Sequence, residues 1–276
     1  MKTHSKIAGL GTALLLASSS ASAIVTTWDY TVASIFTSAT YVGSGGTTAA
    51  LPSTALTWGI PSNPGNLQSS LVVGGTPALG SVDTYLGAAP PTVPPYLGLS
   101  TSLTHNNNVI SGGSTSLSSA VLTNTVTLDP LLPDNPALPP QIVPFSISFT
   151  ETTNATPCAA TSPPGNPCND IFVLTGGLLN FSFDYDAGDG DGLTTYFVNI
   201  FPTTGGVLST LSNSACAAAG APNGCIGFTT PEGQSTTLAF GFTISTRPLQ
   251  VPEPGILALF GIGLVSSLLW RRRRIA

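Results

Sequence analysis

Three segments of this sequence alternate between apolar and polar residues with a period of two, and this pattern constrains the fold more than any other feature. They lie at 145–149, 181–185 and 238–244, where aromatic and aliphatic residues take every second position. Because successive side chains of a strand point to opposite faces, the pattern predicts half-buried β-strands. Weaker candidates occupy 28–37, 53–59, 69–74, 101–110, 116–128, 170–175, 194–201 and 206–211. Roughly ten to twelve short strands predict an all-β fold, a single antiparallel β-sandwich.

Two proline-dense stretches interrupt these strands, at 87–98 and 129–144. Proline cannot donate a hydrogen bond within a sheet, so we expect both stretches to be loops or extended connections. Either could be a domain boundary, but neither flanking half holds enough strong strands to fold alone. We therefore expect one β-sandwich domain over residues 24–250.

The N-terminal segment 1–23 has the features of a secretory signal peptide. Two lysines precede an apolar run at 7–17, and a small-residue cleavage site ends with Ala21 and Ala23. The apolar run is too short for a membrane anchor. We expect the mature chain to begin at Ile24, after export.

The last residues, 251–276, combine three features in a fixed order: a proline-containing tetrapeptide, an apolar run at 255–270 and a basic cluster. As a helix the apolar run would span roughly 24 Å, slightly short of the ~30 Å core of a bilayer. Arginines beside an apolar run hold that end in the cytoplasm, so the pattern predicts a transmembrane helix. The tetrapeptide consists of Val251, Pro252, Glu253 and Pro254, and the basic cluster of Arg271, Arg272, Arg273 and Arg274.

The order of these parts resembles the PEP-CTERM sorting signal of Gram-negative bacteria. In that family exosortase, a membrane protease-transpeptidase, cuts near the Pro-Glu-Pro and releases the protein to the envelope or an exopolysaccharide matrix. The resemblance implies exosortase as the processing partner. It also implies an inner-membrane intermediate before delivery to the cell surface or extracellular matrix. An ordinary single-span anchor is the alternative on physical grounds alone.

Removal of both terminal signals would leave a strongly acidic domain. Arg247 is the one basic residue within 24–250, against eleven acidic residues, so the net charge is near −10 (1 minus 11). Such a surface repels phosphate groups, which makes nucleic acid and anionic lipid poor partners.

Four cysteines lie in the region expected to be exported, where disulfides persist, and three pairings are possible. Each neighbouring pair encloses a short segment rich in Pro, Ala, Gly and Asn. Short loops close readily, so we favour the pairs Cys158–Cys168 and Cys216–Cys225. A metal site is the alternative, but it would need shorter ligand spacings and usually histidines.

A Thr-His-x-Asn motif is formed by Thr104, His105 and Asn107, and four other short blocks accompany it. The other blocks are Trp28-Asp29-Tyr30, Leu56-Thr57-Trp58-Gly59, Cys168-Asn169-Asp170-Ile171-Phe172 and Gly227-Phe228-Thr229-Thr230-Pro231-Glu232. Together they resemble the THxN family of PEP-CTERM proteins over essentially the whole of 24–250. The resemblance implies export and the extent of the domain, but no particular chemistry.

His105 is the single histidine of 24–250, and three roles are open to it. A Ser-His-Asp or Cys-His catalytic site could use it, although a Gly-x-Ser-x-Gly motif is absent and the cysteines pair. It could instead contact a ligand or glycan. We favour a structural role, in which the imidazole hydrogen-bonds across the asparagine-rich turn after a strand in 100–110.

Four aspartates lie within eight residues, at Asp184, Asp186, Asp189 and Asp191. Oxygen-rich loops with glycine turns are what calcium requires, although this spacing departs from an EF-hand loop. The simpler interpretation is a hairpin turn between strands at 178–185 and 194–201. Calcium binding is the alternative. A glycosidase pair would need two of these carboxylates placed across a substrate.

These patterns favour an exported, non-enzymatic β-sandwich with a structural or adhesive role, associated with exopolysaccharide or biofilm. The first alternative is a secreted carbohydrate-binding module, which the acidic loop would make calcium-dependent. The second is a secreted glycoside hydrolase.

Overall fold

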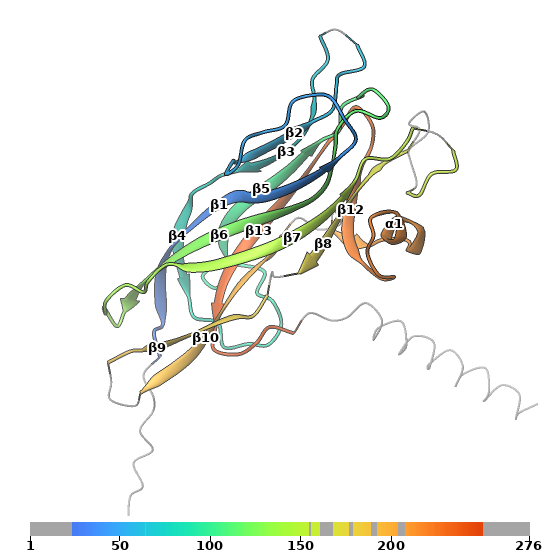
Figure 1. Ribbon diagram of the computed structural model, residues 1–276. Helices are drawn as coiled ribbons and strands as arrows, with labels where there is room; N and C mark the ends of the chain where they lie inside the picture. Colours follow the sequence, from blue (N-terminus) through green and yellow to red (C-terminus); the bar gives the residue numbers. More distant parts are fainter. Residues whose placement is uncertain are drawn as a thin grey trace, which may run out of the picture.

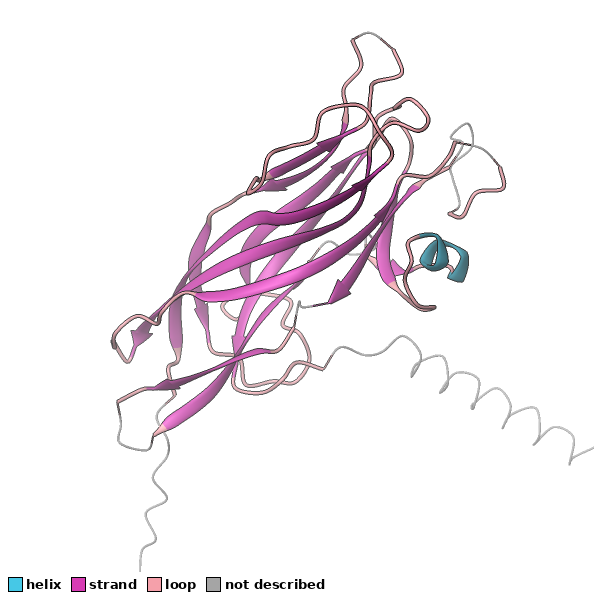
Figure 2. Ribbon diagram, viewed as in Figure 1, coloured by secondary structure: helices cyan, strands magenta, loops and turns pink. Residues whose placement is uncertain are grey.

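The computed structural model describes residues 24–63, 65–154, 156–160, 168–176, 179–188, 192–203 and 208–250. Over these residues the chain forms thirteen strands and one short helix (Figures 1 and 2). The strands make two antiparallel sheets that share one hydrophobic core. The prediction of an all-β, antiparallel fold is therefore confirmed. The predicted signal peptide at 1–23 and the sorting segment at 251–276 lie outside the described residues.

The first sheet has seven strands and the second has six. In spatial order the first sheet contains β11 (Ser209–Thr210), β12 (Ile226–Thr230), β8 (Asp170–Gly176), β7 (Gln141–Thr150), β6 (Ser116–Leu132), β1 (Thr27–Val42) and β4 (Ala78–Asp83). The second sheet contains β2 (Ala55–Trp58), β3 (Ser69–Gly74), β5 (Gly98–Asn106), β13 (Ser235–Ser245), β10 (Leu193–Pro202) and β9 (Phe181–Asp186).

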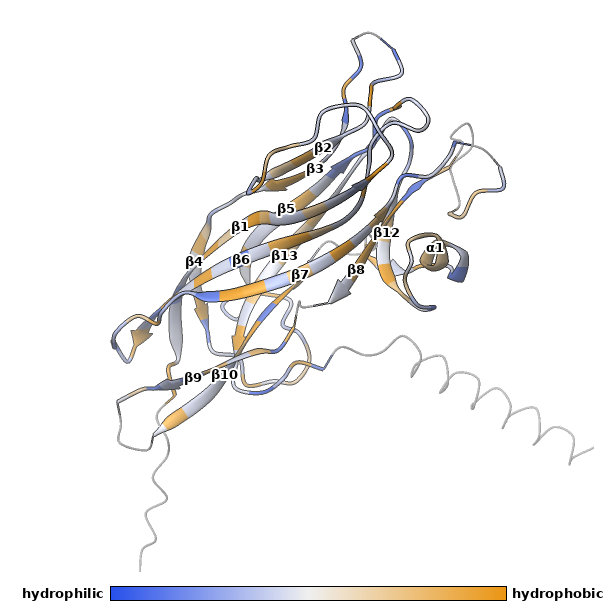
Figure 3. Cartoon of the chain, in the orientation of Figure 1, coloured by the Kyte–Doolittle hydropathy of each residue, from blue (hydrophilic) through white to orange (hydrophobic). Residues whose placement is uncertain are grey.

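The core lies between the sheets because the strands bury alternate residues. In β1 every second residue from Trp28 to Phe36 is buried, and Figure 3 shows hydrophobic and hydrophilic residues alternating along several strands. Burial of one large apolar side chain contributes about 1.5–3 kcal/mol. The largest fully buried side chains include Trp28, Trp58 and Tyr196, and the two tryptophans belong to different sheets.

Two strands are much longer than the sequence pattern predicts. β1 has 16 residues and β6 has 17, so the expectation of short strands is wrong for this pair. They remain paired along nearly their whole length, with register shifts that include one between Phe36 and Ser38. An extra residue at such a bulge lets long strands bend and twist while the inward alternation resumes beyond it.

The stretch 129–144 is not a loop throughout, which corrects the sequence interpretation. β6 continues to Leu132 and β7 begins at Gln141. Pro130 pairs beside a register shift in β1, where a missing N–H is tolerated. Pro144 pairs with β6 alone, because β8 pairs with β7 only from Ser146 onward. Both prolines therefore occupy positions where a strand can lack one hydrogen bond.

Three elements lie outside the predicted strands, namely β4, β12 and the helix α1 (Asn213–Ala218). Ser212 caps α1 by accepting a hydrogen bond from the Ala215 backbone N–H at 3.2 Å. α1 contributes to a small second cluster that buries Ile171 and Val173 of β8. β8 is consequently covered on both faces, which explains why its sequence does not alternate.

Candidate functional site

Three acidic side chains gather near one end of the two sheets, where Asp170 is buried and Glu151 and Glu232 are partly buried. Glu151 follows β7, Asp170 begins β8 and Glu232 follows β12. Each is close enough for its charge to act on Asp170. Together with Trp58 and His105, which pack beside them, they form what we call the acidic cluster.

Trp58 links β2 of the second sheet to the cluster. Its side chain is fully buried, and its indole N–H donates a hydrogen bond to Glu151 Oε2 at 2.7 Å. The alternating burial of β2 turns Leu56 and Trp58 inward. A buried indole needs an acceptor for its N–H, and the carboxylate of Glu151 supplies it.

Only one of the two carboxylate oxygens of Asp170 accepts hydrogen bonds. Its Oδ1 accepts hydrogen bonds from the Thr152 backbone N–H at 2.9 Å and from the Thr152 hydroxyl at 3.3 Å. Its Oδ2 has no hydrogen-bond partner and lies 3.9 Å from His105 Nε2. The residue is 1% exposed, so neither oxygen is solvated by bulk water. Thr230 is the register partner of Asp170 on β12, and its buried hydroxyl also lacks a partner.

His105 lies in β5 rather than in the turn that follows. Its ring stacks on Trp58, with centroids 5.8 Å apart, and meets the edge of Phe149 at 4.9 Å. The predicted hydrogen bond across the turn is not made by Nε2, which has no partner. Asn106 and Asn108 instead bond across to β3 and its start, through Ser70 Oγ at 3.0 Å and the Gln68 carbonyl at 2.9 Å.

Burial sets the protonation of the cluster. Loss of solvent raises the pKa of Glu151 to about 7, against the lowering effect of the hydrogen bond from Trp58. Loss of solvent also raises the pKa of Asp170 well above its usual range, and the charges of Glu151 and Glu232 add to this effect. Burial also lowers the pKa of His105 to about 3. A charged imidazole would need an anion beside it, and burial disfavours the anionic form of Asp170. Burial therefore favours the neutral forms of both His105 and Asp170, which face each other.

Burial thus favours the protonated forms of Glu151 and Asp170 over ion pairs. Arg247 is the one basic residue in 24–250, and it follows β13 after Ser245, far along that strand from the end that pairs with His105. A general acid must also reach a substrate. None of the three cavities described next is lined by Glu151, Asp170 or Glu232.

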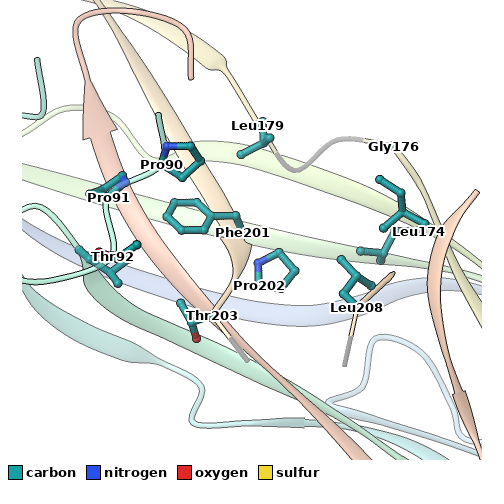
Figure 4. Close-up of a pocket in the computed structure, with 12 residues that line it drawn as sticks. Pro90, Pro91, Thr92, Leu174, Gly176, Leu179, Phe201, Pro202, Thr203 and Leu208 are labelled. Atoms are coloured by element: carbon teal, nitrogen blue, oxygen red, sulfur yellow. The ribbon is translucent and has the colours of Figure 1, made fainter. Parts of the chain in front are cut away.

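The first cavity, of about 680 Å³, is mainly apolar and lies between the proline-rich loop after β4, the end of β10 and the strands β8 and β12. Figure 4 shows Pro90, Pro91 and Phe201 on one side of it and Leu174 and Leu208 on another. The second, of about 600 Å³, lies between β9 and the 136–141 segment. The third, of about 460 Å³, is lined by residues of β1, β4 and β6.

The predicted acidic loop lies only partly within the described residues. Asp184 and Asp186 lie in β9, while Asp189 and Asp191 lie outside the described residues. Asp184 Oδ1 accepts a hydrogen bond from Thr195 Oγ1 at 2.6 Å, and Asp186 Oδ1 accepts one from the Gly188 N–H at 2.8 Å. These contacts fit the interpretation of a hairpin between β9 and β10. Within the described part of the chain, no three His, Cys, Asp or Glu side chains are grouped to hold a metal ion.

Both predicted disulfides are confirmed. Cys158 is bonded to Cys168, just before β8, and Cys216 of α1 is bonded to Cys225, just before β12. The first closes a loop beside the acidic cluster, since Asp170 follows Cys168 by two residues, and the second lies in the small cluster to which α1 contributes.

Four of the five sequence blocks meet in or beside the acidic cluster. They contribute Trp58, the Thr104–His105–Asn107 motif, Asp170, and Thr230 with Glu232. Asn107 completes the connection, because its Nδ2 donates to the Thr230 carbonyl at 3.0 Å. Glu151 belongs to no block and was missed. A signal was present, since 24–250 contains only two glutamates and both join the cluster.

A comparison with protein families identifies a PEP-CTERM protein-sorting motif at residues 250–274. This motif implies an exported protein with a C-terminal sorting signal that exosortase processes. No curated protein matches the chain. Among the described residues, no helix is long and apolar enough to cross a membrane.

Proposed function

We propose that this chain is a non-catalytic protein of the cell envelope or extracellular matrix of a Gram-negative bacterium, with a structural or adhesive role associated with exopolysaccharide. The observation that carries the proposal is the sorting motif at 250–274, which begins five residues after β13 ends at Ser245. The β domain is therefore the cargo of the signal. Its disulfides suit an oxidising compartment outside the cytoplasm.

The titratable groups of the interior support a non-catalytic role. His105 and Asp170 are buried and Glu151 is partly buried, and they take part in packing and in hydrogen bonds to the backbone and to Trp58. A nucleophile or general base would have to face a substrate. A surface rich in Ser and Thr is suited to contact with hydrated polysaccharide.

Processing tests the proposal directly. Expressed in a host with exosortase, the surface protein should run from Ile24 to near Pro254 and lack the arginine cluster, as measured by intact mass. Glu253→Ala should leave a membrane-bound precursor. Glu232→Gln, a matched change outside the sorting motif, should be processed normally. Recovery of Arg271–Arg274 on the final surface protein would contradict sorting by exosortase.

The second cavity favours a carbohydrate-binding module as the second candidate. It combines an aromatic residue, Tyr185, with the polar side chains of Asp184, Asp186 and Gln141, a composition typical of glycan sites. Calorimetric titration of residues 24–250 with exopolysaccharide fragments, with and without calcium, should then show saturable binding without turnover. Gln141→Ala should weaken it and Gln68→Ala, in a distant loop, should not. Absence of binding would leave the structural role, which a change in matrix stiffness on gene deletion would support.

A further inference from the structure

The chain leaves the described structure at a fixed point. Leu249 is buried, and its N–H donates to Asn180 Oδ1 at 2.6 Å while its carbonyl accepts from Asn180 Nδ2 at 3.1 Å. The N–H of Gln250 then donates to the Ala88 carbonyl at 2.7 Å. In Figure 1 the loop between β4 and β5 lies beside the end of the described chain. The point where the sorting segment begins is therefore tied to this loop.

The connection from this point to the apolar run is short. Four residues, 251–254, separate Gln250 from Gly255. Even fully extended, the five steps reach no more than about 17 Å. A globule of this size has a radius of gyration of about 17 Å. If the apolar run is inserted in a bilayer, the domain cannot turn freely, and the surface around Gln250 must face the membrane.

The loop on that surface is uncharged, and two charged residues border it: Asp83, whose N–H donates to the Pro95 carbonyl at 2.9 Å, and Arg247. Residues 84–100 contain no charged side chain, and four large apolar side chains of this loop and the start of β5 are exposed. They are Leu86 (57%), Val93 (62%), Tyr96 (39%) and Leu99 (74%). The first cavity adjoins them through Pro90, Pro91 and Leu97. Arg247, exposed three residues before Gln250, is the single basic residue of 24–250.

Each of these features suits the interface of a bilayer. Exposed aliphatic side chains enter the boundary between headgroups and acyl chains, and tyrosine is enriched at headgroup level. A guanidinium group pairs with headgroup phosphates. The acidic domain as a whole is not drawn to anionic lipid, so the short tether and the apolar side chains must supply the contact.

We propose that the surface formed by Leu86, Val93, Tyr96, Leu99 and Arg247, which we call the tether face, lies against the bilayer that holds residues 255–270 in the unprocessed precursor. The inference rests on the proposed function, because it requires a membrane-anchored intermediate. Contact with the bilayer would present the Pro252–Pro254 segment at the membrane surface, where a membrane protease reads it. Cleavage would release the domain, because the tether face alone is small.

Depth-dependent quenching tests the tether face in the full chain. A tryptophan is introduced by Val93→Trp in a Trp270→Phe background and reconstituted in phosphatidylcholine vesicles that contain brominated lipid. The matched control is Leu67→Trp, at a site 72% exposed between β2 and β3 at the far end of the molecule. Trp28 and Trp58 are fully buried and give the same background in both. We expect Val93→Trp to lose most of its added fluorescence and Leu67→Trp to lose none.

The outcomes separate this inference from the proposed function. If the chain floats with vesicles but the Val93→Trp signal is not quenched, or both sites are quenched equally, the tether face is wrong and anchoring stands. If the chain does not float with vesicles, anchoring fails and the inference fails with it. The emission of Val93→Trp without vesicles gives a third outcome. If this emission is blue-shifted and the shift disappears on truncation at Gln250, the tether face is also wrong, because the apolar run would then fold onto its own domain.

Discussion

The two buried tryptophans of the core occupy similar positions in the two sheets and differ in the group that accepts their indole hydrogen bond. Both are fully buried. Trp28 Nε1 donates to the Thr84 hydroxyl at 2.9 Å, and Trp58 Nε1 donates to the Glu151 carboxylate at 2.7 Å. One acceptor is always neutral and the other can ionise.

The surroundings continue this difference. Trp28 packs against the rings of Phe183, Tyr185 and Tyr196, and the Tyr196 hydroxyl accepts the Val25 N–H at 2.8 Å. The carboxylates at this end, on β9, point away from the core. At the Trp58 end the carboxyl groups face inward with His105. The comparison shows that two buried regions of one core can differ in their response to pH, because only the Trp58 end has a buried carboxyl group and a buried imidazole.

Removal of either indole should give the largest effect. Trp28→Ala and Trp58→Ala should each lower the free energy of unfolding by about 3–5 kcal/mol through lost packing. Trp58→Ala should lose a further ~1–3 kcal/mol at pH 8, because an ionised Glu151 would be buried without its donor. Urea unfolding at pH 5 and pH 8 measures both. An equal pH dependence of the two variants would show that the Glu151 hydrogen bond does not distinguish the two ends.

Glu151→Gln should stabilise the protein at alkaline pH. The pKa of Glu151 is raised from 4.5 to about 7, so the folded state retains a proton that the unfolded chain releases. The resulting stability is fully present below pH 4.5 and is lost as the pH rises through about 7, a loss of about 3 kcal/mol at most. The variant should therefore gain up to that amount at pH 8 and change little at pH 4.5. Asp129→Asn, at an exposed site of β6, is the control, and an equal gain there would contradict the assignment to Glu151.

His105 should produce the opposite slope. The pKa of His105 is lowered from 6.5 to about 3 in the folded state. Between these two values the imidazole is protonated in the unfolded chain and neutral in the folded protein. Stability is lost as the pH falls, by about 2 kcal/mol at pH 5. Adding His105→Phe to the Glu151→Gln variant isolates this effect, because Asp170 and Glu232 are common to both proteins. From pH 7 to pH 5 the double variant should gain about 2 kcal/mol relative to the single variant; parallel curves would mean that His105 titrates normally.

The strand pattern could be predicted from the sequence wherever one face of a strand is solvated, as in β7, β9 and β13. The sequence of β8 does not alternate, because α1 covers the outer face of this strand. The sequence of β4 does not alternate either, because Gly80 leaves room for the Tyr30 ring. The disulfides followed from loop length alone. Short sequence patterns were thus sufficient to predict those features whose contacts join residues near each other in the sequence.

The acidic cluster could not be predicted in the same way. Its members are separated by up to 174 residues, from Trp58 to Glu232, and no local spacing brings them together. The short sequence blocks that carry the family resemblance contain most residues of the cluster, but they do not show that these residues are in contact. Glu151 was missed because a single carboxyl after a strand reads as a solvated end, and only the packing of the two sheets encloses it.

Asp184→Asn and Asp186→Asn at the Trp28 end should give the smallest effect. Both carboxylates are exposed, and an amide oxygen can still accept from Thr195 Oγ1 and from the Gly188 N–H. Solvent screens the lost charge, so the free energy of unfolding should change by no more than about 0.5 kcal/mol at both pH 5 and pH 8. Asp170→Asn is the matched interior change, and it should stabilise at pH 8 because the amide stays neutral. A loss well above 1 kcal/mol in either surface variant would show that the Trp28 end also depends on its carboxylates. The two ends would then differ in degree and not in kind.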